Sequence, residues 1–153
     1  MRFYHLALLG LGFISSVNAA DITIFYSPSC PHCHHARDFI KNELVYEYND
    51  LTVTEINATL VEHRGDFINA LNKCKYTSGG VPVLVIGDKC FQGYGVALND
   101  EIRAAIEVDY NDAQKESVKS NQSDLAADRD AFVAAHKSRQ NAIINQDENV
   151  KKN

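Results

Sequence analysis

The fold is decided by the stretch Cys30-Pro31-His32-Cys33. Before it, residues 22–26 form a short apolar, β-prone run, and after it residues 34–44 repeat apolar side chains with helical period. A thiol at the start of a helix faces unpaired backbone N–H groups and the positive end of the helix dipole, which favour the reactive thiolate. The pattern predicts a strand, a redox-active pair of cysteines and a helix, in that order.

Each residue of this tetrapeptide has a chemical reason to be there. The two-residue spacer lets the sulfur of Cys33 reach that of Cys30, so that the pair can open and close a disulfide. Pro31 fits the first helical turn, where its missing N–H costs nothing. His32 can add positive charge or a hydrogen bond beside the Cys30 sulfur. Cys30, Cys33 and His32 are therefore the candidate catalytic residues.

The first nineteen residues have the composition of a secretory signal peptide. Met1 and Arg2 give a positive start, residues 6–17 are apolar, and small residues occupy the cleavage positions before Ala20. The alternative is an uncleaved membrane anchor, but the apolar run is shorter than the roughly 20 residues that a bilayer span needs. We expect a mature chain that starts at Ala20, has no stable membrane insertion, and is periplasmic or secreted.

Charge and cysteine content narrow the function. The chain of 153 residues has a formal net charge of −5, which argues against a nucleic-acid partner, because such proteins present a basic face. All four cysteines lie in the mature part, and disulfides form and persist outside the cytosol. The second pair, Cys74 and Cys90, predicts a structural disulfide. The alternative is a second redox pair that exchanges with Cys30 and Cys33.

After the signal, the chain divides into a domain over residues 20–108 and a polar tail over residues 109–153. Periodicity and turn residues in the domain predict the order strand, helix, strand, helix, strand, strand, helix. The expected elements are 22–26, 30–44, 51–56, 64–74, 81–86, 89–94 and 99–108. The first two strands should be parallel, because a helix joins them, and the last two should form an antiparallel hairpin. The predicted fold class is α/β, with a mixed four-stranded sheet and helices on both faces.

The tail is rich in Asn, Asp, Gln, Lys, Ser and Ala and contains no proline or glycine. Ser123 predicts the cap of one helix from Asp124 to about Ile144, with a thin apolar stripe. Two interpretations remain open. The tail is either a solvated helix with a disordered end or a helix for docking or dimerisation.

Two separated motifs resemble the thioredoxin superfamily. They are the cysteine pair after a strand, and Val81-Pro82 at the start of another strand about fifty residues later. The resemblance covers Asp21 to Val108; the size is similar to a glutaredoxin, and the tetrapeptide is the one found in DsbA-type oxidants. It implies a thioredoxin-like fold in which a cis proline lies beside the sulfurs. It also implies that Pro31, Val81 and Pro82 contact the substrate, with the Val81 backbone pairing like an added strand.

The resemblance further implies that Cys30 is the nucleophile and that Cys33 resolves the mixed disulfide. It also implies that the disulfide of this couple is a good oxidant. The chain also departs from the family pattern. DsbA has an inserted helical domain for which this chain has no room. Thioredoxins and DsbA carry an acid six residues before the first cysteine, where this chain has Ile24. The lysine and Gly-Gly-Asp element of glutaredoxins are not matched, so glutathione binding and a cofactor are not predicted.

Three other interpretations use the same residues. Cys30-x-x-Cys33-His34 matches the c-type haem pattern, but the only methionine is Met1, so a histidine would have to be the second axial ligand. The cysteines and the histidines at 32, 34 and 35 could supply ligands for zinc or copper(I), although neighbours on a helix point in different directions. A non-catalytic thioredoxin-like binding module would have an inert disulfide.

These observations predict an exported thiol–disulfide oxidoreductase that acts on protein thiols through the Cys30/Cys33 couple, as an oxidant or isomerase rather than a reductase. Its partners would be cysteine-containing client proteins and a redox protein that resets the active site.

Overall fold

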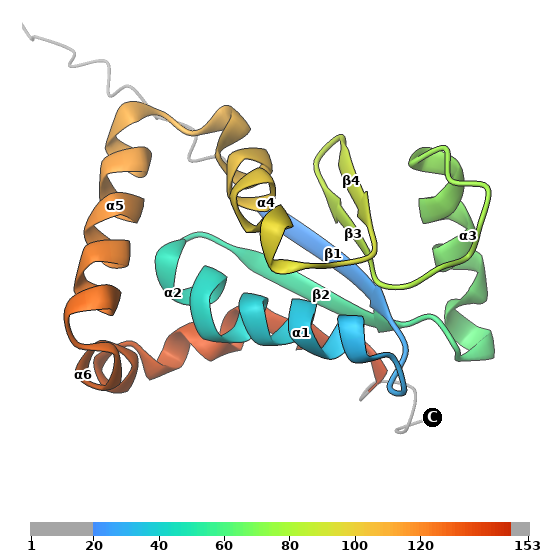
Figure 1. Cartoon of the computed structure of the whole chain (residues 1–153), viewed down its shortest axis with the longest axis horizontal. Helices are drawn as coiled ribbons and strands as arrows, with labels where there is room; N and C mark the ends of the chain where they lie inside the picture. Colours follow the sequence, from blue (N-terminus) through green and yellow to red (C-terminus); the bar gives the residue numbers. More distant parts are fainter. Residues whose placement is uncertain (1–19, 148–153) are drawn as a thin grey trace, which may run out of the picture.

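A computed structural model of the chain describes residues 20–147 (Figure 1). The predicted signal peptide lies outside these residues. One sheet has the strand order β4-β3-β1-β2-β5. Its strands are β1 (Asp21–Tyr26), β2 (Thr52–Asn57), β3 (Val83–Ile86), β4 (Lys89–Gln92) and β5 (Ile143–Asn145). The prediction of four strands was wrong by one, because β5 comes from the C-terminal segment and joins the sheet beside β2.

The strand directions agree with those predicted for the domain. β1 and β2 are parallel, with Ile24 opposite Glu55, while β3 runs antiparallel to both β1 and β4. The added strand β5 is parallel to β2. Because β1 and β2 run the same way, the segments after Tyr26 and Asn57 leave the same edge of the sheet, and the first of them leads to Cys30 and Cys33 at the start of α1.

Six α-helices surround the sheet within residues 20–147. They are α1 (Pro31–Phe39), α2 (Val45–Glu47), α3 (Arg64–Lys73), α4 (Asn99–Ile106), α5 (Asp112–Ala127) and α6 (Arg129–Ala135). A π-helical stretch, Ile40–Leu44, joins α1 to α2, and short 3₁₀ turns lie at Val61–His63, Val96–Leu98, Glu107–Asp109 and Lys137–Ala142. No helix in the described part of the chain combines the length and the apolar character that a membrane span requires.

Apolar side chains on the two faces of the sheet form two cores, so the prediction of helices on both faces is confirmed. The larger core packs α1, α4 and α5 against Ile24, Val53 and Leu84 of the sheet. The smaller core joins Phe25 and Ile56 to the apolar side chains of α3. Burial alternates along β1 and β2 because successive side chains of a strand point to opposite faces.

The C-terminal region differs from the single helix predicted over 124–144. Its first helix, α5, begins much earlier, because the Asn111 side chain accepts a hydrogen bond from the Gln114 N–H and completes a capping box. Asp128 then ends α5 and caps α6. Val118 and Leu125 are buried in the larger core, so α5 packs on the domain instead of lying in solvent.

Candidate active site

The two cysteines of the tetrapeptide lie at the start of α1, as predicted. Cys30 is the N-cap residue, Pro31 occupies the first turn, and the sulfurs of Cys30 and Cys33 are within disulfide-bonding distance. The Cys30 sulfur accepts a hydrogen bond from the Cys33 N–H at 3.1 Å. Cys33 is 1% exposed, whereas Cys30 is half-buried, so an incoming thiol can reach Cys30 and not Cys33.

The Val81-Pro82 segment lies directly beside the cysteine pair. The distance from the Cys30 sulfur to the Val81 carbonyl oxygen is 3.6 Å, and the peptide bond between Val81 and Pro82 is cis. Pro82 is buried, and its carbonyl accepts a hydrogen bond from the Gly93 N–H at 2.8 Å. The chain therefore brings together, across fifty-one positions, the two motifs that carry the family resemblance.

The histidines around the tetrapeptide are exposed. The His34 ring forms a hydrogen bond with the Pro28 carbonyl at 2.8 Å. His32 makes no hydrogen bond with any part of the chain that the structure describes, so the predicted hydrogen bond to the Cys30 sulfur is not present in this structure. Residues 20–147 contain no group of three or more His, Cys, Asp or Glu side chains placed to hold one metal ion.

A buried carboxylate that the sequence analysis missed lies below α1. Glu55, on β2, is 4% exposed, and both its oxygens accept hydrogen bonds from the Arg37 guanidinium of α1, at 2.9 and 2.7 Å. This hydrogen bonding raises the pKa of Arg37. Glu55 is the register partner of Ile24 on the neighbouring strand β1. The alternation of β2 could have located it, since Glu55 shares the face of buried Val53.

Tyr26 completes this layer at the end of β1. The Arg37 guanidinium carbon lies 4.2 Å from the centre of the Tyr26 ring, a cation–π contact. The phenol donates a hydrogen bond to Asp147 at 2.7 Å. Burial, followed by this hydrogen bond to a carboxylate, raises the pKa of Tyr26. The side chains beneath the cysteine-bearing helix are therefore both charged and fully paired.

Cys74 and Cys90 are also joined. Cys74 ends α3, Cys90 lies on β4, and their Cα atoms are 5.8 Å apart with a disulfide between the sulfurs. Cys90 pairs in the sheet with Val85, which packs into the smaller core beside α3. α1 packs into the larger core, so the two disulfides belong to opposite faces of the sheet.

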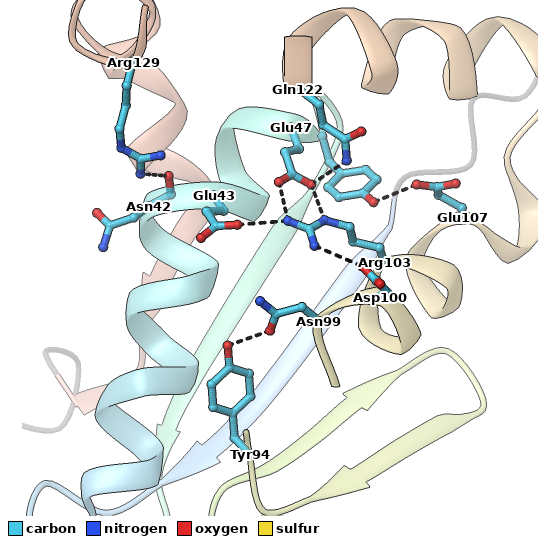
Figure 2. A network of polar contacts seen from close by, with 11 residues as sticks. Asn42, Glu43, Glu47, Tyr94, Asn99, Asp100, Arg103, Glu107, Gln122 and Arg129 are labelled. Atoms are coloured by element: carbon cyan, nitrogen blue, oxygen red, sulfur yellow. Dashed lines mark hydrogen bonds and ion pairs between the residues drawn. The ribbon is translucent and has the colours of Figure 1, made fainter. Parts of the chain in front are cut away.

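A cavity of about 660 Å³ lies beyond the C-terminal end of α1, between α2, α4 and α5. Figure 2 shows its central residue, Arg103 of α4, held by the carboxylates of Glu43 and Glu47 at 2.9 and 2.7 Å. Gln122 of α5 donates to the same Glu47 carboxylate at 3.0 Å. Hydrogen bonding with Glu47 raises the pKa of Arg103. At 1.5 Å of helical rise per residue, Glu47 lies roughly 20 Å from Cys33, so this cluster ties α2, α4 and α5 together and does not serve the cysteines.

No family model matches the chain, and a search of curated proteins found no match. Among solved structures, the chain is similar to the crystal structure of the glutaredoxin grx-1 from Archaeoglobus fulgidus, at 23% identity and a TM-score of 0.44. That alignment covers 57% of this chain and 86% of the glutaredoxin. The described residues themselves form a mixed α/β architecture with one five-stranded sheet.

Proposed function

We propose that the protein is an exported thiol–disulfide oxidoreductase that acts on protein thiols through Cys30 and Cys33. One observation carries this proposal: the half-buried Cys30 sulfur caps α1, lies 3.6 Å from the Val81 carbonyl and is paired with the buried sulfur of Cys33. A thiolate formed there is stabilised by the Cys33 N–H and by the helix N-terminus. A well-stabilised thiolate favours the reduced form, which makes the disulfide a better oxidant.

The reaction transfers two electrons. A client thiolate attacks the Cys30 sulfur, the Cys30–Cys33 bond breaks, and Cys33 leaves as a thiolate that takes up a proton. A second client thiolate then attacks the client sulfur of the mixed disulfide, and Cys30 leaves as a thiolate. The client dithiol is oxidised to a disulfide, the Cys30/Cys33 pair is reduced, and a separate redox protein must reoxidise it. In isomerisation, the thiolate of reduced Cys30 attacks a client disulfide, which forms a mixed disulfide and releases one client thiolate. A client thiolate then attacks the client sulfur of the mixed disulfide, a new client disulfide forms, and Cys30 leaves as a thiolate with no net oxidation.

The proposal is tested by the rate at which the oxidised protein forms disulfides in a reduced, unfolded client. Cys30→Ser should abolish this activity. Cys33→Ser, mixed with a client that already contains disulfides, should accumulate a mixed disulfide through Cys30, because Cys30 attacks a client disulfide and Cys33 is absent to resolve the product. The Cys74→Ala/Cys90→Ala variant, which removes the other two cysteines, is the control and should retain the activity. A Cys30→Ser protein with wild-type activity would contradict the mechanism.

The reduction potential of the Cys30/Cys33 couple, measured by equilibration with glutathione, tests whether the protein oxidises or reduces its clients. A potential well above that of thioredoxins supports an oxidant or isomerase. A potential near or below theirs contradicts this part of the proposal and indicates a reductase. Rapid reduction of the pair by dithiothreitol under native conditions also separates the proposal from an inert binding module.

Export is supported by the signal-like composition of residues 1–19 and by the structure next to the expected cleavage site. The Ala20 carbonyl already accepts a hydrogen bond from the Thr52 N–H at 2.9 Å, and β1 begins at Asp21. Cleavage before Ala20 therefore leaves a chain whose first residues are held by the sheet. The exported protein should have the mass of a chain that begins at Ala20. Recovery of an uncleaved chain from the cytosol would contradict this part of the proposal.

A further inference from the structure

The C-terminal segment 143–147 returns to the sheet next to the elements that carry the cysteines. β5 pairs with β2 from Val53 to Glu55, and the Gln146 N–H donates a hydrogen bond to the Glu55 carbonyl at 3.0 Å. In Figure 1 this red segment runs alongside β2 and α1. A cavity of about 380 Å³ between them is lined on one side by Arg37 of α1 and Lys41 of the π-helical stretch that follows it, and on the other side by Ile143.

Two side chains of this segment bond to the buried layer below α1. The Asn145 side-chain amide donates to the Glu55 carboxylate at 3.2 Å and to the Tyr26 oxygen at 3.4 Å. The Asp147 carboxylate accepts from the Tyr26 hydroxyl at 2.7 Å and from the Asn57 N–H at 3.3 Å. Tyr26, Glu55 and Asn57 are all at least nine-tenths buried, so the segment is held by groups in the interior of the protein.

The same layer holds the chain on both sides of the cysteines. Tyr26 comes four residues before Cys30, and Arg37 comes four residues after Cys33 and so shares its face of α1. Arg37 binds both Glu55 and the face of the Tyr26 ring. Any movement of segment 143–147 therefore acts on the strand that leads into Cys30 and on the helix that follows it.

Charge gives the segment a second means of acting on the cysteines. Glu55 and Asp147 place two carboxylates near the single guanidinium of Arg37, and the His63 ring nitrogen Nε2 lies 3.9 Å from Asp147. Asp147 bonds to Tyr26, four residues before Cys30, so its carboxylate adds negative charge at the end of the sheet where the cysteine-bearing segment begins and opposes a negative thiolate there. Removing it should favour the thiolate and hence the reduced form of the cysteine pair.

We infer that the C-terminal segment belongs to the redox site: Asn145 and Asp147 are positioning residues that set the reactivity of the Cys30/Cys33 pair through Tyr26, Glu55 and Arg37. This inference rests on the proposed function only in taking the pair to be redox-active. It assigns a role to a region that lies beyond the stretch carrying the family resemblance.

The test is the equilibrium between glutathione and the Cys30/Cys33 pair in the full chain, together with the thiolate titration of Cys30. Asp147→Asn keeps the shape of the side chain and removes its charge. It should shift the equilibrium toward the reduced protein by about threefold or more, the size expected when one nearby charge is lost. The matched control is Asp124→Asn, an exposed side chain of α5, which makes the same change in net charge and should leave the equilibrium unchanged.

Asn145→Ala removes contacts without changing charge, and its control is Asn141→Ala, an exposed position two residues before the segment. Asn145→Ala should alter the glutathione equilibrium and speed amide exchange at the start of α1, while the control does neither.

Lower melting temperatures with an unchanged equilibrium for both Asp147→Asn and Asn145→Ala would overturn the inference and leave the segment a simple edge strand. Equal shifts for Asp147→Asn and Asp124→Asn would also overturn it. A wild-type protein whose cysteine pair equilibrates with glutathione but oxidises no client would contradict the proposed function. The inference about Asn145 and Asp147 would still be tested by the glutathione equilibrium, which does not involve a client.

Discussion

Replacing Cys74 and Cys90 by alanine should destabilise the protein without changing its active site. Their disulfide closes a separation of 16 residues between the end of α3 and β4. In the chain-entropy model, a loop of this length restricts the unfolded state enough to contribute about 3 kcal/mol to stability. Both residues are half-buried, so the loss of packing around the sulfurs should be small beside that value.

The assay is thermal and urea unfolding of the Cys74→Ala/Cys90→Ala variant beside the wild type, with the Cys30/Cys33 pair kept oxidised in both. A loss of about 3 kcal/mol corresponds to a fall in melting temperature of roughly 10 °C for a chain of this size. The glutathione equilibrium of Cys30/Cys33 is measured on the same samples and should not change, because the two disulfides belong to opposite faces of the sheet.

Two results would refute this reasoning. A variant that melts within about 2 °C of the wild type would show that the disulfide does not stabilise the fold to the extent that loop closure requires. A variant whose Cys30/Cys33 equilibrium shifts strongly, with little loss of stability, would indicate that electrons pass between the two pairs. The second pair would then be a redox centre, which is the alternative that the sequence left open.

Three further predictions concern single side chains. His32→Leu should raise the pH at which reduced Cys30 ionises, and an unchanged thiolate titration would remove His32 from the mechanism. Ile102→Ala should lower the free energy of unfolding in urea by about 2–5 kcal/mol, because this fully buried side chain of α4 would leave a cavity. Burial, followed by hydrogen bonding to an acid, raises the pKa of Tyr48, so its contribution to stability is complete below about pH 10 and is lost as the pH rises further. The free energy of unfolding in urea should therefore decrease less steeply with pH above about pH 10 for Tyr48→Phe than for the wild type.

Local sequence was sufficient to predict the core of the domain. The boundaries of β1 and α1 follow from the apolar run before Cys30, the cap at Cys30 and the proline at the first helical position, all of which act between neighbours in the chain. The hairpin of β3 and β4 follows from Gly87, which adopts the left-handed conformation in the turn. The pairing of the Cys30 site with Val81-Pro82 was available only through resemblance, because nothing local joins positions so far apart.

The C-terminal region was predicted least well, because the sequence patterns that specify its helices and its strand are short. The capping box at Asn111 is a local feature that the sequence does contain, and attention to it would have located the start of α5. β5 has three residues, too few for a period to be recognised, and its strand conformation depends on pairing with β2.

By itself, the sequence determined the element order of the domain, the place of the cysteine pair at a helix start and the alternation that directs Glu55 inward. These properties depend on backbone preference and on periodicity, which act over a few residues. Only the tertiary structure decided that Arg37 binds Glu55, that Asn145 and Asp147 join them from the far end of the chain, and that the sheet has a fifth strand. A buried charge requires partners of fitting geometry, and chain folding alone determines which distant side chains are close enough to supply them.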